Sequence, residues 1–221
     1  MQNFLKQIEE SNEYIGEYID LYQVHSATFE SGILTDKRIH KALDQCRLEH
    51  GWKIGLSVSG PNQDDVLREA MKIQVANENG DCRRLFDSVQ CTYNLLEQKP
   101  GPALQEAHDA GMDIIIKEGL ANGRLLTDGN CQNRYRLLSG VASELGVSTD
   151  QLALAFILTQ DFTPRVLSGA VTAEHLQSNH KAVELAGLLK KSHVEILARL
   201  ADGCVMDSDT YWADRKALVW N

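Results

Sequence analysis

Short apolar segments recur along the chain, and each is followed by a longer stretch with helical spacing. The apolar segments are Tyr18–Val24, Trp52–Val58, Phe86–Cys91, Met112–Lys117 and Pro164–Leu167. Nearly continuous apolar runs of this length are typical of strands in a parallel sheet. We therefore predict five strands that are buried on both faces.

The stretches between these strands carry signals for the start and end of helices. Thr35–His50 has apolar residues on one helical face and is followed by Gly51, a residue type that ends helices. The same spacing predicts helices at Asp64–Ala76, Pro102–Ala110, Arg134–Leu145 and Thr172–Leu189. Capping-box spacings predict two further helix starts, at Ser148 with Gln151 and at Ser192 with Glu195. Strands that alternate with helices indicate a parallel α/β fold.

Composition and charge narrow the class of protein. The chain has 221 residues, of which 43% are hydrophobic, as in an ordinary globular domain. We expect one domain over residues 1–221, with residues 203–221 as a C-terminal tail. The net charge is 22 − 31 = −9, with no run of Lys or Arg. This charge disfavours nucleic acid and anionic membranes as partners.

Targeting and metal-binding signals are weak. No apolar run approaches the ~20 residues that span a bilayer, and the first ten residues are too polar for a signal peptide. The five cysteines form no CxxC pair and the seven histidines form no HxxxH pair. We expect reduced thiols, no metal site and a cytoplasmic location.

Polar or small residues stand at the C-terminal ends of the apolar segments. They are His25, Ser57, Gln90, Lys117 with Glu118, and Ser168 with Gly169. No GxGxxG follows a strand, so a Rossmann site is not supported and part of a (β/α) barrel is the better interpretation. Barrel enzymes bind their ligands at the C-terminal ends of the strands, so these residues predict a ligand site. Five strands are three fewer than the eight that close such a barrel.

Five motifs in order resemble the aldo-keto reductase family. They are EYIDLYQVHS at 17–26, KIGLSVS at 53–59, VQCTYNLLE at 89–97, IIIKEGLANGRL at 114–125 and SGAVTAEHLQSN at 168–179. The resemblance implies a partial TIM (β/α)8 barrel of about five βα units, corresponding to strands four to eight. It also implies that the family's catalytic Tyr, Asp and Lys belong to three βα units ahead of the first strand here.

The resemblance also implies roles for individual residues. His25 would orient the substrate carbonyl, Ser57 and Gln90 would hold the nicotinamide amide, and Lys117 stands where the family has a stacking aromatic. The pyrophosphate would lie along Gly119, Leu120, Asn122 and Gly123, and the adenosine end along Gly169, Ala170, His175 and Asn179. The cofactor would be NADP(H) or NAD(H). The preference is open, because only His175 in that last segment could meet a 2′-phosphate.

These roles imply an oxidoreductase that reduces a small aldehyde or ketone, although not as this chain alone. Tyr93 and Lys117 also end strands and are alternative proton donors. A non-catalytic binding or regulatory subunit on the same scaffold is the alternative function. We expect a homo-oligomer, or a partner chain that covers the open strand edges. The amphipathic tail Asp207–Trp220 would either cap the mouth of the barrel or pack as a plain helix.

Overall fold

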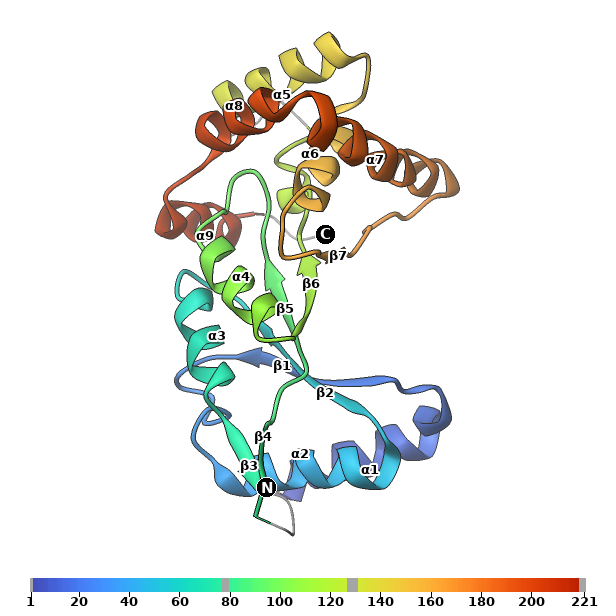
Figure 1. Cartoon of the computed structure of the whole chain (residues 1–221), viewed down its shortest axis with the longest axis vertical. Coiled ribbons are helices and arrows are strands. Elements are labelled where there is room, and N and C mark those ends of the chain that lie inside the picture. The colour runs from blue at the N-terminus through green and yellow to red at the C-terminus, as the bar shows by residue number, and fades with distance from the viewer. Residues whose placement is uncertain (1, 77–79, 127–130, 219–221) are drawn as a thin grey trace.

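A computed structural model describes residues 2–76, 80–126 and 131–218. Its main element is a parallel sheet in the order β1-β2-β5-β6-β7 (Figure 1). The strands are β1 (Leu21–Ala27), β2 (Lys53–Val58), β5 (Ser88–Thr92), β6 (Asp113–Lys117) and β7 (Arg165–Val166). The five predicted strands and their parallel arrangement are therefore confirmed. A short antiparallel pair, β3 (Gln74–Ala76) and β4 (Cys82–Arg84), stands apart from the sheet.

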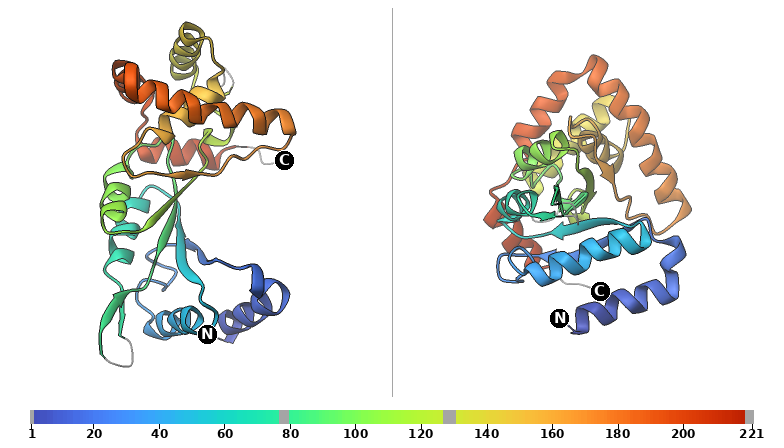
Figure 2. Two further views of the ribbon diagram at one scale, coloured as in Figure 1. Left: turned by 45° about the vertical axis from the view of Figure 1, so that its right-hand side comes forward. Right: turned by 60° about the horizontal axis from the view of Figure 1, so that its bottom comes forward.

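Helices surround this sheet on one side and at both ends, so that the molecule has the form of an open crescent (Figure 2). Helices α1 (Gln2–Ile15) and α2 (Lys37–His50) lie together at one end, with α3 (Gln63–Met71) and α4 (Gly101–Asp109) along the side. The other end holds α5 (Gln132–Leu145), α6 (Thr149–Leu158), α7 (Ala173–Ser192) and α8 (Val194–Cys204). Helix α9 (Ser208–Lys216) returns to the sheet, and two 3-10 turns occur at Gly16–Tyr18 and Ala121–Gly123.

The two faces of the sheet differ in chemistry. One face is apolar and belongs to the core with the helices, with Ile54, Leu56, Val89, Cys91 and Ile116 all fully buried. Successive side chains of a strand point to opposite faces. The other face therefore carries polar residues at the alternate positions, among them Gln23, Ser57, Ser88, Gln90 and Thr92.

The prediction of strands buried on both faces is confirmed for the central strands β2, β5 and β6, although their second face is largely polar, and it is wrong for β1 and β7, which are partly exposed. A Cβ built on Gly55 would collide with Ser88 Oγ and lie 3.0 Å from Gln23 Cγ, so these residues share one face. Three buried atoms there have no hydrogen-bond partner among the described residues: Gln23 Oε1, Ser88 Oγ and Thr92 Oγ1. Buried polar groups are normally paired, so this face is polar without being internally satisfied.

Two predicted helix boundaries are wrong. The helix predicted at Asp64–Ala76 ends at Met71, because Gln74–Ala76 pairs as a strand with Cys82–Arg84 and places Val75 against the core. Ser192 does not start α8, since it is the last residue of α7 and no side chain caps α8. The capping box of Ser148 and Gln151 is confirmed.

The C-terminal tail packs against the loops that follow β5 and β6. Met206 N–H donates to the Leu96 carbonyl at 2.8 Å, and Tyr211 of α9 is fully buried. Trp220, which the tail prediction included, lies outside the described residues. No single helix in the described ranges has the length and apolarity to cross a membrane; the bent pair α5 and α6, at 92°, passes by length and composition only.

Candidate active site

The predicted strand-end residues lie at one edge of the sheet. In the parallel register Ser57 pairs with Gln90, and Thr92 pairs with Lys117. Strand β1 runs in the same direction beside β2, which brings His25 to the same edge. The strand ends therefore come together as the sequence predicts.

His25 lies in a β-bulge near the end of β1. The register between β1 and β2 shifts after Val24, and Ser26 adopts a positive φ of 53°. The Ser57 hydroxyl accepts a hydrogen bond from Ser26 N–H at 2.9 Å, and Ser26 Oγ lies 3.3 Å from the ring nitrogens of His25. Bulges re-aim side chains, and left-handed backbone at non-glycine residues is concentrated at functional sites. The neighbouring strand thus fixes the Ser26 backbone through Ser57, and the exposed His25 ring lies against the Ser26 hydroxyl.

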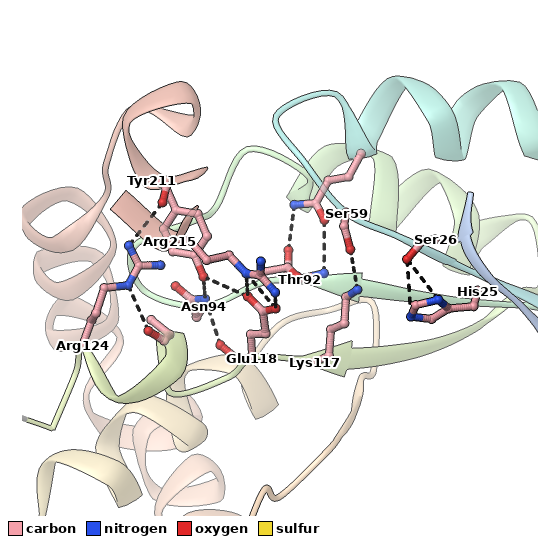
Figure 3. A network of polar contacts seen from close by, with 12 residues as sticks. His25, Ser26, Ser59, Thr92, Asn94, Lys117, Glu118, Arg124, Tyr211 and Arg215 are labelled. Carbon is pink, nitrogen blue, oxygen red and sulfur yellow. Dashed lines mark hydrogen bonds and ion pairs between the residues drawn. The ribbon is translucent and has the colours of Figure 1, made fainter. Parts of the chain in front are cut away.

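Lys117 is a half-buried cation at the end of β6. Its Nζ donates to Ser59 Oγ at 2.6 Å, just beyond the end of β2 (Figure 3). Burial lowers the pKa of the Lys117 ammonium, although the neighbouring Glu118 carboxylate opposes the shift. Ser59 was part of a sequence motif, but nothing in the sequence indicated that it would hold this lysine.

Glu118 joins the edge of the sheet to α9. It has a positive φ of 57°, and its carboxylate accepts two hydrogen bonds from Arg215 Nε at 3.0 and 2.9 Å. Asn94 Nδ2 donates to the Glu118 carbonyl at 2.9 Å and to the Tyr211 hydroxyl at 3.0 Å (Figure 3). Glu118 and Arg215 are 97 residues apart in sequence, so no local motif predicts this network.

Helix α9 also holds the far end of the loop after β6, at Arg124. The Arg124 guanidinium lies 4.1 Å from the centre of the Tyr211 ring and donates to the Tyr211 carbonyl at 3.2 Å. Between Glu118 and Arg124 the backbone of Ala121 and Asn122 is left-handed. Helix α9 therefore fixes both ends of a loop with an unfavourable backbone.

A cavity of about 570 Å³ lies along this loop, a volume within the range of small-molecule sites. Its walls come mainly from two segments far apart in sequence, the loop after β6 and the segment from β7 into α7, together with the start of α6. They include eight predicted site residues: Gly119, Leu120, Asn122, Gly123, Gly169, Ala170, His175 and Asn179. Gly123 and Gly169 have φ of 86° and 62°, which glycine adopts without strain. The sequence therefore identified most of one cavity wall.

Three side chains that can carry charge line this cavity in the described part of the chain: Glu118, Asp150 and His175. Asp150 comes from α6 and was not predicted. Its carboxylate accepts a hydrogen bond from Ser178 Oγ at 2.7 Å, and Gln151 Nε2 donates to the same Ser178 oxygen at 3.0 Å. Burial alone would raise the pKa of Asp150, but hydrogen bonds from Ser148, Ser178 and the backbone outweigh it and lower the pKa.

The remaining predicted residues lie outside this cavity wall. His25, Ser57, Gln90 and Lys117 occupy the strand ends beyond Glu118. A second hollow of about 660 Å³ lies there, between the loop after β2 and α9, with Ser59 and Arg215 in its wall. Glu118 lines the first cavity and its partner Arg215 lines the second hollow, so the ion pair between them borders both spaces.

Two residues near the strand ends change the predicted chemistry. Tyr93 cannot act as a proton donor here, because it is buried against Phe156 and Phe162 and its hydroxyl donates to Gln160 Oε1 at 3.1 Å. Gln63, which the sequence did not single out, binds both the N–H and the carbonyl of Thr92, at 3.2 and 2.9 Å. It fixes the end of β5 next to Lys117. The described side chains include no group of three His, Cys, Asp or Glu that could hold a metal.

Comparison with known proteins gives the family context. The model of the aldo/keto reductase family matches residues 1–202. The chain is 36% identical over 80 residues to L-glyceraldehyde 3-phosphate reductase of Escherichia coli K12, covering 36% of this chain and 23% of that protein. It is 28% identical over 160 residues to the enzyme of the same name from E. coli O157:H7, covering 71% and 45%. The chain thus spans less than half of these curated relatives.

Solved structures show the same fold. The apo form of an aldo-keto reductase from Bacillus halodurans aligns with a TM-score of 0.70 at 22% identity, covering 93% of this chain and 70% of that one. A thermostable aldo-keto reductase in complex with the inhibitor epalrestat aligns with a TM-score of 0.67 at 19% identity, covering 91% and 66%. The α/β fold with its five-stranded parallel sheet therefore matches the fold of these aldo-keto reductases, which are TIM barrels.

Proposed function

We propose, because this chain belongs to the aldo/keto reductase family, that it binds a nicotinamide dinucleotide at the C-terminal edge of its sheet and serves carbonyl reduction by hydride transfer. One observation carries the proposal. The cavity of about 570 Å³ gathers all eight residues to which the family resemblance assigns the pyrophosphate and the adenosine.

The shape of the cavity fits such a ligand in one respect. The loop from Gly119 to Gly123 lies directly on α6, since a Cβ on Gly119 would be 3.1 Å from side-chain atoms of Leu154 and Ile157. At Gly123 and Gly169, which also line the cavity, no atom lies within 4 Å of a built Cβ, so a phosphate can approach the backbone closely there. The pyrophosphate would follow this loop, and the nicotinamide would reach Ser57, Gln90 and Lys117.

The acidic side chains of the cavity are less favourable for a pyrophosphate. Glu118 would repel a pyrophosphate if its charge were uncompensated. The ion pair with Arg215, whose side chain is 28% exposed against 11% for Glu118, compensates that charge. Asn179 would shape the adenosine end of the cavity by holding Ser168, because its Nδ2 already donates to the Ser168 carbonyl and hydroxyl at 2.9 and 2.8 Å.

Carbonyl reduction needs a hydride and a proton. The dinucleotide supplies the hydride when bound, and His25 would orient the carbonyl. The family's proton donor is a tyrosine on the three βα units that precede the first strand here. We propose that the reaction needs these units, supplied by a longer form of the protein or by a second chain. These 221 residues alone would then bind the dinucleotide without reducing carbonyls.

Calorimetric titration with NADH and NADPH tests the binding. We expect weak binding of at least one dinucleotide, because contacts from the preceding units are absent, and a further loss of about five- to tenfold on Gln90→Ala or Asn179→Ala. Gln45→Ala, on the exposed side of α2, is the matched control and should change nothing. A folded sample that binds neither dinucleotide would contradict the proposal.

Loss of NADH or NADPH absorbance with a panel of carbonyls tests the reaction. Glyceraldehyde 3-phosphate belongs in the panel, because both E. coli relatives carry its name. We expect no turnover by the chain alone. Turnover of about 1–10³ s⁻¹ that His25→Ala abolishes would show that the preceding units are dispensable. Binding without turnover in the longest available form would favour the non-catalytic alternative.

A further inference from the structure

We infer that the adenosine end of this cavity selects NAD(H) over NADP(H), with Asp150 as the residue that rejects a 2′-phosphate. The inference rests on the proposed function, since it concerns the same cavity. It goes further by naming the form of the cofactor and the residue that decides it.

The position of Asp150 is the first observation. It lies at the start of α6, yet it lines the cavity together with His175 and Asn179 of α7. The Ser178 hydroxyl donates to Asp150 Oδ2 at 2.7 Å and ties the two helices together at this point. The carboxylate is therefore part of the cavity wall, and its location is fixed by a neighbouring helix.

The balance of charge is the second observation. No Lys or Arg is among the described residues that line the cavity, and the one side chain there that could become cationic is His175. Arg215, which compensates Glu118, lies at the other end of the loop. At the adenosine end the carboxylate of Asp150 is thus not matched by a permanent cation.

The protonation state of Asp150 agrees with this assignment. Its hydrogen bonds lower the pKa against the opposing effect of burial, so the group is ionised at neutral pH. Glu174, beside His175, is exposed, and its pKa is also lowered by hydrogen bonds at the start of α7. Both acidic groups near His175 therefore carry negative charge.

The two cofactor forms meet this charge differently. A ribose 2′-hydroxyl can donate a hydrogen bond to a carboxylate, which is how acidic residues recognise NAD in other folds. A 2′-phosphate carries close to two negative charges and offers no donor when ionised. A cavity that contains Asp150 and no permanent cation therefore favours the hydroxyl.

Calorimetric titration of the 221-residue chain with NADH and NADPH tests the inference. We expect NADH to bind at least about tenfold more tightly, with a smaller difference at high salt because ions screen the repulsion. The fragments 5′-AMP and 2′,5′-ADP probe the adenosine end alone and should show the same order. Asp150→Asn should tighten NADPH binding by about three- to tenfold and lower the NADH-to-NADPH affinity ratio by at least that factor, because the amide removes the charge that repels the 2′-phosphate.

Two further variants keep the test decisive. Asp161→Asn removes an exposed carboxylate beyond α6 that pairs with Lys190 at 3.1 Å, and it should leave the NADH-to-NADPH ratio unchanged. His175→Arg adds a permanent cation at an exposed position of the cavity and should shift preference toward NADPH by about tenfold. The expected effect of His175→Arg does not depend on the hydrogen bonds of Asp150.

The outcomes separate this inference from the proposed function. Binding of NADPH as tightly as NADH by the unaltered chain would overturn the inference and leave the proposed function standing. A selective preference for NADH that Asp150→Asn does not alter would overturn the assignment to Asp150. A folded chain that binds neither dinucleotide would overturn both.

Discussion

Lys117, at the end of β6, lies at the candidate site and reduces the stability of the fold. The ammonium is half-buried and donates a hydrogen bond to a neutral hydroxyl, Ser59 Oγ. Burial of a cation without a close counter-charge is unfavourable, and this is the cause of its lowered pKa. Such groups are concentrated at functional sites.

We predict that Lys117→Met stabilises the protein near neutral pH. Because the pKa of Lys117 is lower in the folded than in the unfolded chain, the unfolded chain binds the proton more readily, and the group reduces stability at pH 7. This penalty fades as pH rises toward the ordinary lysine pKa of about 10.4. Thermal unfolding at pH 7 should show Tm raised by about 2–4 °C, and the gain should shrink by pH 10.

The exposed Lys41 of α2 provides the control for this measurement. Lys41→Met should leave Tm nearly unchanged at both pH values. A Lys117→Met variant that is less stable than the unaltered protein at pH 7, or equally stabilised at pH 7 and pH 10, would contradict the prediction.

At the scale of elements, α9 holds the loop between Glu118 and Arg124 in its left-handed conformation. Arg215 binds Glu118 at one end of the loop, and the Tyr211 ring packs against the Arg124 guanidinium at the other end. Non-glycine residues with positive φ persist only where surrounding contacts hold them. Helix α9 is therefore a positioning element for the wall of the candidate cofactor cavity.

We predict that Arg215→Ala loosens this loop and weakens the fold. Glu118 would be left with a largely buried and uncompensated carboxylate, so the free energy of unfolding should fall by about 1–3 kcal/mol. Hydrogen exchange of the backbone amides at 118–126 should accelerate. Arg199→Ala breaks a short but exposed ion pair with Glu144, at 2.7 Å, and should cost less than about 1 kcal/mol. Equal effects of the two substitutions would contradict the role of α9.

The sequence predicted those elements whose signals are local. Apolar runs located the five strands, and Gly51 and the Ser148 capping box located helix ends, because backbone geometry at such ends depends on neighbouring residues. The hairpin of β3 and β4 was missed because strands of three residues are too short for a periodic pattern. Asp150 and Arg215 were missed because helix packing between distant segments brings them to the site.

At the scale of the whole molecule, the sheet has a polar face and two open edges. The edges are β1 and β7, as the sequence predicts for the first and last strands. On the polar face, Gln23 Oε1, Ser88 Oγ and Thr92 Oγ1 have no hydrogen-bond partner in the described part of the structure. Unpaired strand edges favour pairing with another chain, and unpaired buried polar atoms are rare in a finished fold.

We predict from these features that the isolated 221-residue chain associates with further copies of itself. Sedimentation velocity should give a mass above the 24.6 kDa of one chain, and Tm should rise with protein concentration because association stabilises the folded form. Gln23→Lys places a charge on the edge strand β1 and should shift the distribution toward the monomer, since charges on edge strands oppose pairing. Gln45→Lys, on the exposed side of α2, should not. A monodisperse monomer whose sharp unfolding transition is independent of concentration would show that the open sheet is stable without a second chain.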